Sequence, residues 1–131
     1  MDLTDLTGLK SLHVCMVAYG VDPLQGSEAA NAWHWIDQMA QRVERISLIT
    51  SANGSERLHA LAHSGHQLQP NVEVLTVESH RSVMAPPVPG WYRQYGAWLD
   101  EAAFAVADVN ADLSHHVVVG SPFWGVDGRV G

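Results

Sequence analysis

The feature that most constrains this chain is the alternation of short apolar runs with longer stretches of helical periodicity. The apolar runs occupy residues 11–19, 45–51, 72–78 and 112–120. Short runs of this kind, rich in branched side chains, are typical of buried strands. Strands that alternate with helices form a parallel sheet that is wrapped on both faces and joined by right-handed crossovers. The sequence therefore predicts an α/β fold, a Rossmann-like βαβαβαβ domain of three layers with a parallel sheet.

Two of the predicted helices have a clear apolar face. The first begins near Ser27 and carries apolar side chains at alternating spacings of four and three, which places them on one face: Ala29, Trp33, Ile36, Ala40 and Val43. The longest helix is predicted over residues 91–110, and its core stripe is widened by Trp91 and Trp98: Tyr92, Tyr95, Leu99, Ala102, Val106 and Val109. Both helices are expected to pack on the sheet.

The remaining segments are assigned from turn chemistry. Asn53-Gly54 is predicted to be a turn, after which Ser55 caps a short helix that ends near Gly65. The proline-rich segment 84–90 can be neither a helix nor a central strand, so we expect a loop.

Composition is that of a globular protein and excludes several functions. Fourteen acidic residues against seven basic ones give a net charge of −7, and no Lys/Arg cluster offers a basic face, so nucleic-acid binding is not expected. The single cysteine, Cys15, allows no internal disulfide and fits a reducing compartment. The sequence shows neither a secretory signal nor a run of the ~18 apolar residues that a membrane span needs. We therefore expect a cytoplasmic protein, with peripheral membrane contact left open.

The chain is divided into an N-terminal extension, residues 1–10, and one domain, residues 11–131. The segment SPFWGVDGRVG after the fourth predicted strand has no helical pattern that could cover this strand. Parallel sheets are normally covered on both faces. We hypothesise that the domain is incomplete, and that a C-terminal domain or a partner chain covers the open side.

The turn before the first helix is the first candidate site. Ligands of open parallel sheets bind at the carboxyl ends of the strands, where the strand order reverses. If the first and fourth strands are neighbours, this point adjoins residues 20–27. Backbone N–H groups near Ser27 can bind an anion, Gly26 permits close approach of a ligand, and Glu28 lies in the same helical turn. A Gly-Ser helix cap without a ligand is the alternative interpretation.

Histidines form the second group of candidates. His115 and His116 are adjacent in a predicted strand, so their side chains point to opposite faces. One of them can bond a sugar hydroxyl or a reacting oxygen at the strand end, and the alternative is a core histidine. His59, His63 and His66 raise the question of a metal site. Because no cysteine or third fixed ligand accompanies them, a solvated helix surface is expected instead.

Several segments together resemble a known family. They are PLQGSEAANAWHW, ISLITS, WYRQY and ADLSHHVVVGSPFW, which occur in this order. This set is similar to the N-terminal domain of GT-B-type glycosyltransferases, specifically the retaining, nucleotide-sugar-dependent enzymes of family 4. In one branch of that family a G-S-E-x-x-x-x-W stretch opens the first helix and a D-x-x-H-H-V segment forms the fourth strand. The resemblance covers residues 12–124, nearly all of the chain.

The resemblance implies half of a GT-B fold, with a cleft between this domain and a C-terminal one. It implies that the N-terminal domain mainly binds the acceptor, that Gly26 and Ser27 line the donor side, and that His115 or His116 lies near the transferred sugar. Its partners would be a nucleotide-sugar and an acceptor small molecule or glycan, and it implies no catalytic metal or other cofactor.

The sequence also departs from the family pattern. Gln25 stands where many members have the first of two glycines, and no two glutamates have the spacing of the acidic pair of the C-terminal domain. The chain is therefore expected to be inactive alone. The alternative is a stand-alone Rossmann-like module that binds a small ligand or a partner without catalysis.

Overall fold

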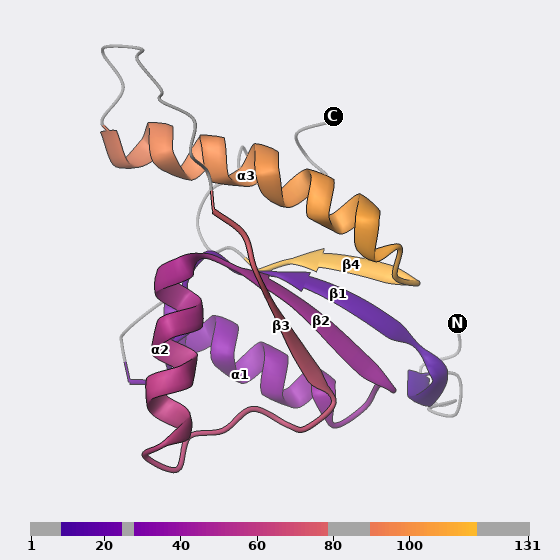
Figure 1. Ribbon diagram of the computed structural model, residues 1–131. Coiled ribbons are helices and arrows are strands. Elements are labelled where there is room, and N and C mark those ends of the chain that lie inside the picture. The colour runs from indigo at the N-terminus through magenta and orange to yellow at the C-terminus, as the bar shows by residue number, and fades with distance from the viewer. Residues whose placement is uncertain (1–8, 25–27, 79–89, 118–131) are drawn as a thin grey trace.

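Figure 1 shows the computed structural model, which describes residues 9–24, 28–78 and 90–117. The elements follow one another as a 3₁₀ turn η1 (Leu9–Ser11), β1 (His13–Val17), α1 (Glu28–Ala40), β2 (Arg45–Thr50), α2 (Ala52–Ala62), β3 (Val72–Thr76), α3 (Gly90–Val109) and β4 (Leu113–His116). The predicted βαβαβαβ order is confirmed. Each strand is shorter than predicted.

The four strands are all parallel and lie in the order β3-β2-β1-β4. The first and fourth strands are neighbours, and β1 lies between β2 and β4. Val17 at the end of β1 pairs with Ile49 on one side and with His116 on the other. The carboxyl ends of these three strands therefore lie together at one edge of the sheet, here named the carboxyl edge.

Helices cover both faces of the sheet, as predicted (Figure 1). Successive side chains of a strand point to opposite faces, and β1 shows this directly. Val14 and Met16 belong to the core under α1 and α2, whereas Cys15 and Val17 belong to the core under α3. Cys15 is fully buried, as expected for a core residue.

The predicted helix faces are largely confirmed. Ile36 and Ala40 of α1 are buried, and Trp33 is half-buried and packs against the same core. Among the described side chains of α3, Ala97, Trp98, Leu99 and Ala102 are buried, with Tyr95, Val106 and Val109 packed around them. The predicted Trp91 and Tyr92 side chains lie outside the described ones. Residues 84–89 of the predicted proline-rich loop lie outside the described residues, and Gly90 is already the first residue of α3.

The start of the second helix was predicted wrongly. Asn53 and Gly54 are not a turn but lie in the first turn of α2, and the cap is Ser51 instead of Ser55. The Ser51 backbone is extended and its side chain accepts a hydrogen bond from the Gly54 N–H. A cap with this geometry satisfies one of the free N–H groups at the helix start. Contacts with β1, described below, explain why the helix begins here.

In the part of the chain that the structure describes, no helix is long and apolar enough to cross a membrane.

Within the sheet, β4 is an edge strand, and its first three residues are exposed. Leu113 keeps 52% of its surface in contact with solvent, a large fraction for a leucine in a strand.

Candidate functional site

The carboxyl edge collects the segment after β1, the start of α2 and the end of β4. In parallel α/β sheets this edge is where ligands bind. Of the predicted site residues, Gly26 and Ser27 lie outside the described residues. Glu28 is the first residue of α1, and its side chain is not described. The predicted helix start is therefore confirmed, and a role for these three residues in ligand binding stays a prediction.

The segment after β1 is fixed to the start of α2 by hydroxyl groups. The Ser51 Oγ donates to the carbonyl oxygen of Tyr19 over 2.7 Å, and the Thr50 Oγ1 donates to the same oxygen over 3.3 Å. The Ser51 Oγ also accepts from the Gly54 N–H at 3.1 Å. One buried serine therefore caps α2 and anchors the end of β1.

Gly54 allows this close approach. A Cβ at this position would overlap the Thr50 Oγ1 and would lie 3.1 Å from the Tyr19 carbonyl oxygen. Distances this short are not tolerated without a shift of the neighbouring groups, so a residue without a side chain is needed here. Gly20 differs, because a Cβ there would meet only the Ala29 Cβ, at 3.9 Å.

A charged pair closes the far side of the same junction. The Arg57 Nε of α2 donates to the Asp22 Oδ2 over 2.6 Å. The Asp22 Oδ1 accepts from the Leu24 N–H at 2.9 Å, and the Asp22 N–H donates to the Ala29 carbonyl at 3.0 Å. The Asp22 side chain is 3% exposed, whereas that of Arg57 is 44% exposed. Asp22 is thus a structural carboxylate that shapes its turn, and Arg57 offers its outer edge to solvent.

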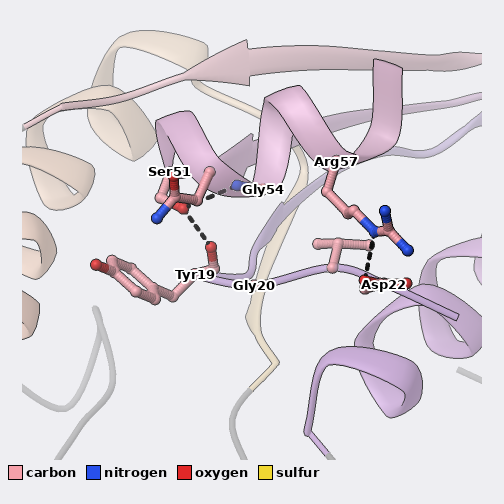
Figure 2. A pocket seen from close by; sticks show the side chains of 8 residues that line it. Tyr19, Gly20, Asp22, Ser51, Gly54 and Arg57 are labelled. Atoms are coloured by element: carbon pink, nitrogen blue, oxygen red, sulfur yellow. Dashed lines mark hydrogen bonds and ion pairs between the residues drawn. The ribbon is translucent and has the colours of Figure 1, made fainter. Parts of the chain in front are cut away.

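These contacts border a cavity of about 370 Å³ that is open to solvent. It is lined by Tyr19, Gly20, Val21, Asp22, Ser51, Asn53, Gly54 and Arg57. Figure 2 shows Tyr19 at one end, the Asp22–Arg57 pair at the other, and the two glycines between them. Sequence reasoning missed this cavity, although Asp22 two residues after Gly20 is typical of a turn in which an Asx side chain bonds the backbone.

The two predicted histidines lie on opposite faces of β4, as predicted. His115 is exposed, and its ring lies 6.1 Å from that of Trp35 on α1, measured between centroids. The His116 Nε2 lies 3.3 Å from the Tyr95 Oη of α3, a hydrogen bond in which either group can donate. His116 is thereby oriented by α3, while the ring of His115 is accessible from the α1 side.

An aromatic cluster supports the His116 side. The Tyr19 ring stands edge-on to the rings of Tyr95 and Trp98, with centroid distances of 5.1 and 5.0 Å. The buried Trp98 also donates its indole N–H to the Val77 carbonyl over 2.7 Å. Edge-to-face aromatic pairs are favourable beyond their buried area. The orientation of His116 therefore depends on packing that reaches back to the end of β1.

One further contact, between His13 and Ser47, resembles a catalytic pair of a nucleophile and a general base. At the opposite edge of the sheet, the His13 Nε2 lies 2.8 Å from the Ser47 Oγ. The Arg45 Nη2, however, lies 3.2 Å from the His13 Nδ1, and a guanidinium can only donate. The Nδ1 must then accept, so the proton is on Nε2 and is donated to Ser47. A general base needs a free lone pair at this nitrogen, so this trio is structural.

The metal question concerns the exposed histidines of α2. The rings of His59 and His63 lie 5.1 Å apart, measured between centroids. Among the described residues there is no group of three or more His, Cys, Asp or Glu side chains that could hold a metal ion.

No protein-family model matches this sequence, and a comparison with curated proteins gives no significant match either. The structure by itself shows a small parallel α/β domain with four strands, Rossmann-like in its sheet order and helix placement.

Proposed function

We propose that this chain forms the acceptor-side half of a retaining GT-B-type glycosyltransferase similar to family 4, with its substrates at the carboxyl edge. The observation that carries the proposal is the adjacency of β1 and β4. The two most specific motifs of the resemblance are far apart in the sequence. PLQGSE follows β1 and HHV lies at the end of β4, and these two strands are neighbours in the sheet. This is the adjacency that a shared substrate site requires.

The reaction sets the roles in this proposal. The bond from the anomeric carbon of the donor sugar to the diphosphate breaks, and a bond from the same carbon to the acceptor oxygen forms on the same face. The diphosphate leaves with the electron pair, and its departing oxygen takes the proton of the acceptor hydroxyl. Backbone N–H groups near Gly26 and Ser27 would stabilise the negative charge that grows on the diphosphate. His115 or His116 would bond a hydroxyl of the transferred sugar.

The proposal assigns to a second domain the cationic groups that hold the diphosphate. With only one half of this electrostatic stabilisation, the 131-residue chain is expected to bind nucleotide-sugars weakly and not to turn them over. Turnover of a nucleotide-sugar by the isolated chain at an enzyme-like rate would contradict this assignment.

Histidine ring NMR signals test the proposal. The chain is titrated with UDP-glucose, GDP-mannose and ADP-glucose, and the variants His115→Ala and His116→Ala assign the two rings. We expect one of the three compounds to shift a ring signal of His115 or His116 and to bind more weakly to that variant. His59→Ala, on the exposed face of α2, is the matched control and should bind like the unchanged protein. If no compound perturbs either ring, or if His59→Ala weakens binding equally, the proposal is wrong.

A stand-alone module that binds a small ligand without catalysis is the second candidate. The observation that favours it is the cavity of about 370 Å³, which is lined by described residues of this chain. It predicts a cooperative melting transition with little binding of a hydrophobic dye below the transition. A glycosyltransferase half whose edge strand β4 lacks its covering domain predicts dye binding already in the folded state.

A further inference from the structure

The cavity and the histidines lie on opposite sides of the end of β1. The cavity is built from the segment after β1 and from α2, which follows β2. His115 and His116 belong to β4, on the other side of β1. The strand order reverses between β1 and β4, so a nucleotide is expected on the histidine side. The cavity is therefore a second candidate site at the carboxyl edge, and the class of ligand that it can bind follows from the groups that line it.

The charges in the cavity favour a neutral ligand. Asp22 and Arg57 form an ion pair in its wall, so their charges balance. An added anion would approach a carboxylate that is 3% exposed and poorly shielded by water, and an added cation would approach the guanidinium. A hydroxyl group can donate and accept hydrogen bonds, and it adds no charge.

The cavity also presents the donors that such a ligand needs. The Arg57 Nε is used by Asp22, while the two terminal nitrogens of the same guanidinium make no hydrogen bond with the described residues. Arg57 is 44% exposed, so these nitrogens are accessible. The exposed side chain of Asn53 adds an amide that both donates and accepts. Planar groups of this kind can bind two neighbouring hydroxyls at once.

The shape limits the size of the ligand. Small-molecule pockets have volumes of roughly 300–1,000 Å³, and this cavity, at about 370 Å³, lies near the lower limit. Tyr19 lies at one end, with its ring turned away toward α3, and the ion pair lies at the other, with the backbone of Gly20 and Gly54 between (Figure 2). A single ring with several hydroxyls matches this volume and the polar groups of Asn53 and Arg57.

We infer that the cavity between Tyr19 and Arg57 is a subsite for a neutral, hydroxyl-rich ring, a sugar or another cyclic polyol. That this ring is the acceptor of a sugar transfer rests on the proposed function, whereas the binding itself does not. The serine and threonine contacts to Tyr19 hold the cavity in shape before a ligand arrives.

Amide chemical shifts in ¹⁵N-labelled protein test this subsite. The probes are methyl α-D-glucopyranoside as the hydroxyl-rich ring, cyclohexanol as a ring with one hydroxyl, and inorganic phosphate as the anion. We expect the glucoside to shift the amide signals of Gly20 and Gly54 with millimolar affinity, and the other two probes to shift them far less. Phosphate binding in place of the glucoside overturns the inference, as does the absence of any shift with the glucoside.

Variants locate the binding. Arg57→Gln and Asn53→Ala should each weaken glucoside binding at least fivefold. Asn53 is exposed, so Asn53→Ala keeps the fold even if Arg57→Gln does not. Arg42→Gln is the matched control, because Arg42 is exposed and, among the described residues, its side chain bonds only to Gln38. Equal weakening in Arg42→Gln, or unchanged affinity in Asn53→Ala and Arg57→Gln, contradicts the subsite.

The two proposals fail separately. If the glucoside binds at the cavity while no nucleotide-sugar perturbs His115 or His116, the subsite stands and the glycosyltransferase assignment is wrong. If nucleotide-sugars perturb a histidine and no polyol binds, the assignment stands and the cavity is not a polyol subsite.

Discussion

Gly54→Ala is the substitution that most directly tests how the cavity is built. The new Cβ would overlap the Thr50 Oγ1 and would lie 3.1 Å from the Tyr19 carbonyl oxygen. Thr50 is fully buried and bonds that same oxygen, so its side chain can move only by giving up the hydrogen bond. Overpacking costs about 1–3 kcal/mol, and the lost hydrogen bond adds about 0.5–1.5 kcal/mol.

Helix propensity acts in the opposite direction. Alanine in a helix interior is favoured over glycine by about 1 kcal/mol, and Gly54 lies in the first turn of α2. The net loss of unfolding free energy is therefore expected to be roughly 0.5–3.5 kcal/mol. Gly20→Ala is the matched control, because its Cβ meets only the Ala29 Cβ at 3.9 Å. We expect the control to change the unfolding free energy by less than about 1 kcal/mol.

Urea unfolding followed by tryptophan fluorescence measures both variants. The midpoint of Gly54→Ala should fall clearly, with a similar slope against urea concentration, while that of Gly20→Ala should stay near the unchanged protein. A Gly54→Ala midpoint at or above that of the unchanged protein would refute the close approach of α2 to the end of β1. So would an equal loss in both variants.

Three further experiments test other contacts. Ser51→Ala removes the cap and the bond to the end of β1 and should lower the free energy of unfolding by about 1–2 kcal/mol. In the same urea experiment, Ser55→Ala should change it by less than about 0.5 kcal/mol. The reverse order of these losses would mean that Ser55 is the cap. In a double-mutant cycle, Asp22→Asn and Arg57→Met should show a coupling free energy of about 1 kcal/mol, since the pair is only partly shielded from water. Additive losses would mean that the ion pair does not stabilise the fold. Trp98→Phe leaves a backbone carbonyl without its indole donor and should lower the melting-derived stability by about 1–3 kcal/mol; an unchanged melting temperature would contradict the hydrogen bond.

The fold could be predicted because its signals are local. The apolar runs and helix faces depend on spacings of a few residues, and the opposite orientation of His115 and His116 follows from the two-residue period of a strand. The order of strands and helices then restricts the sheet to few arrangements. The contacts of the two histidines could not be predicted in this way. His115 lies near Trp35 of α1 and His116 bonds Tyr95 of α3, and neither partner is close to its histidine in the sequence.

The start of α2 shows how a tertiary contact can outweigh a local pattern. Asn53-Gly54 is a strong turn signal in sequence, yet both residues are helical. The bond from Ser51 to the Tyr19 carbonyl joins residues 32 positions apart and fixes the helix start at that point. The Asp22–Arg57 pair joins residues 35 positions apart. The charged wall of the cavity therefore could not be predicted from the sequence around either residue.

Tyr19 has a consequence for the order in which the domain assembles. Its carbonyl oxygen bonds the start of α2, while its ring packs against Tyr95 and Trp98 of α3, so one residue joins both layers. The partners on α2 are much closer to it in sequence than those on α3, and the entropy cost of closing a loop rises with its length. We expect the first βαβα unit to form early and α3 to dock later. Slow hydrogen exchange should therefore be acquired first in β1 and β2 and last in α3 during refolding.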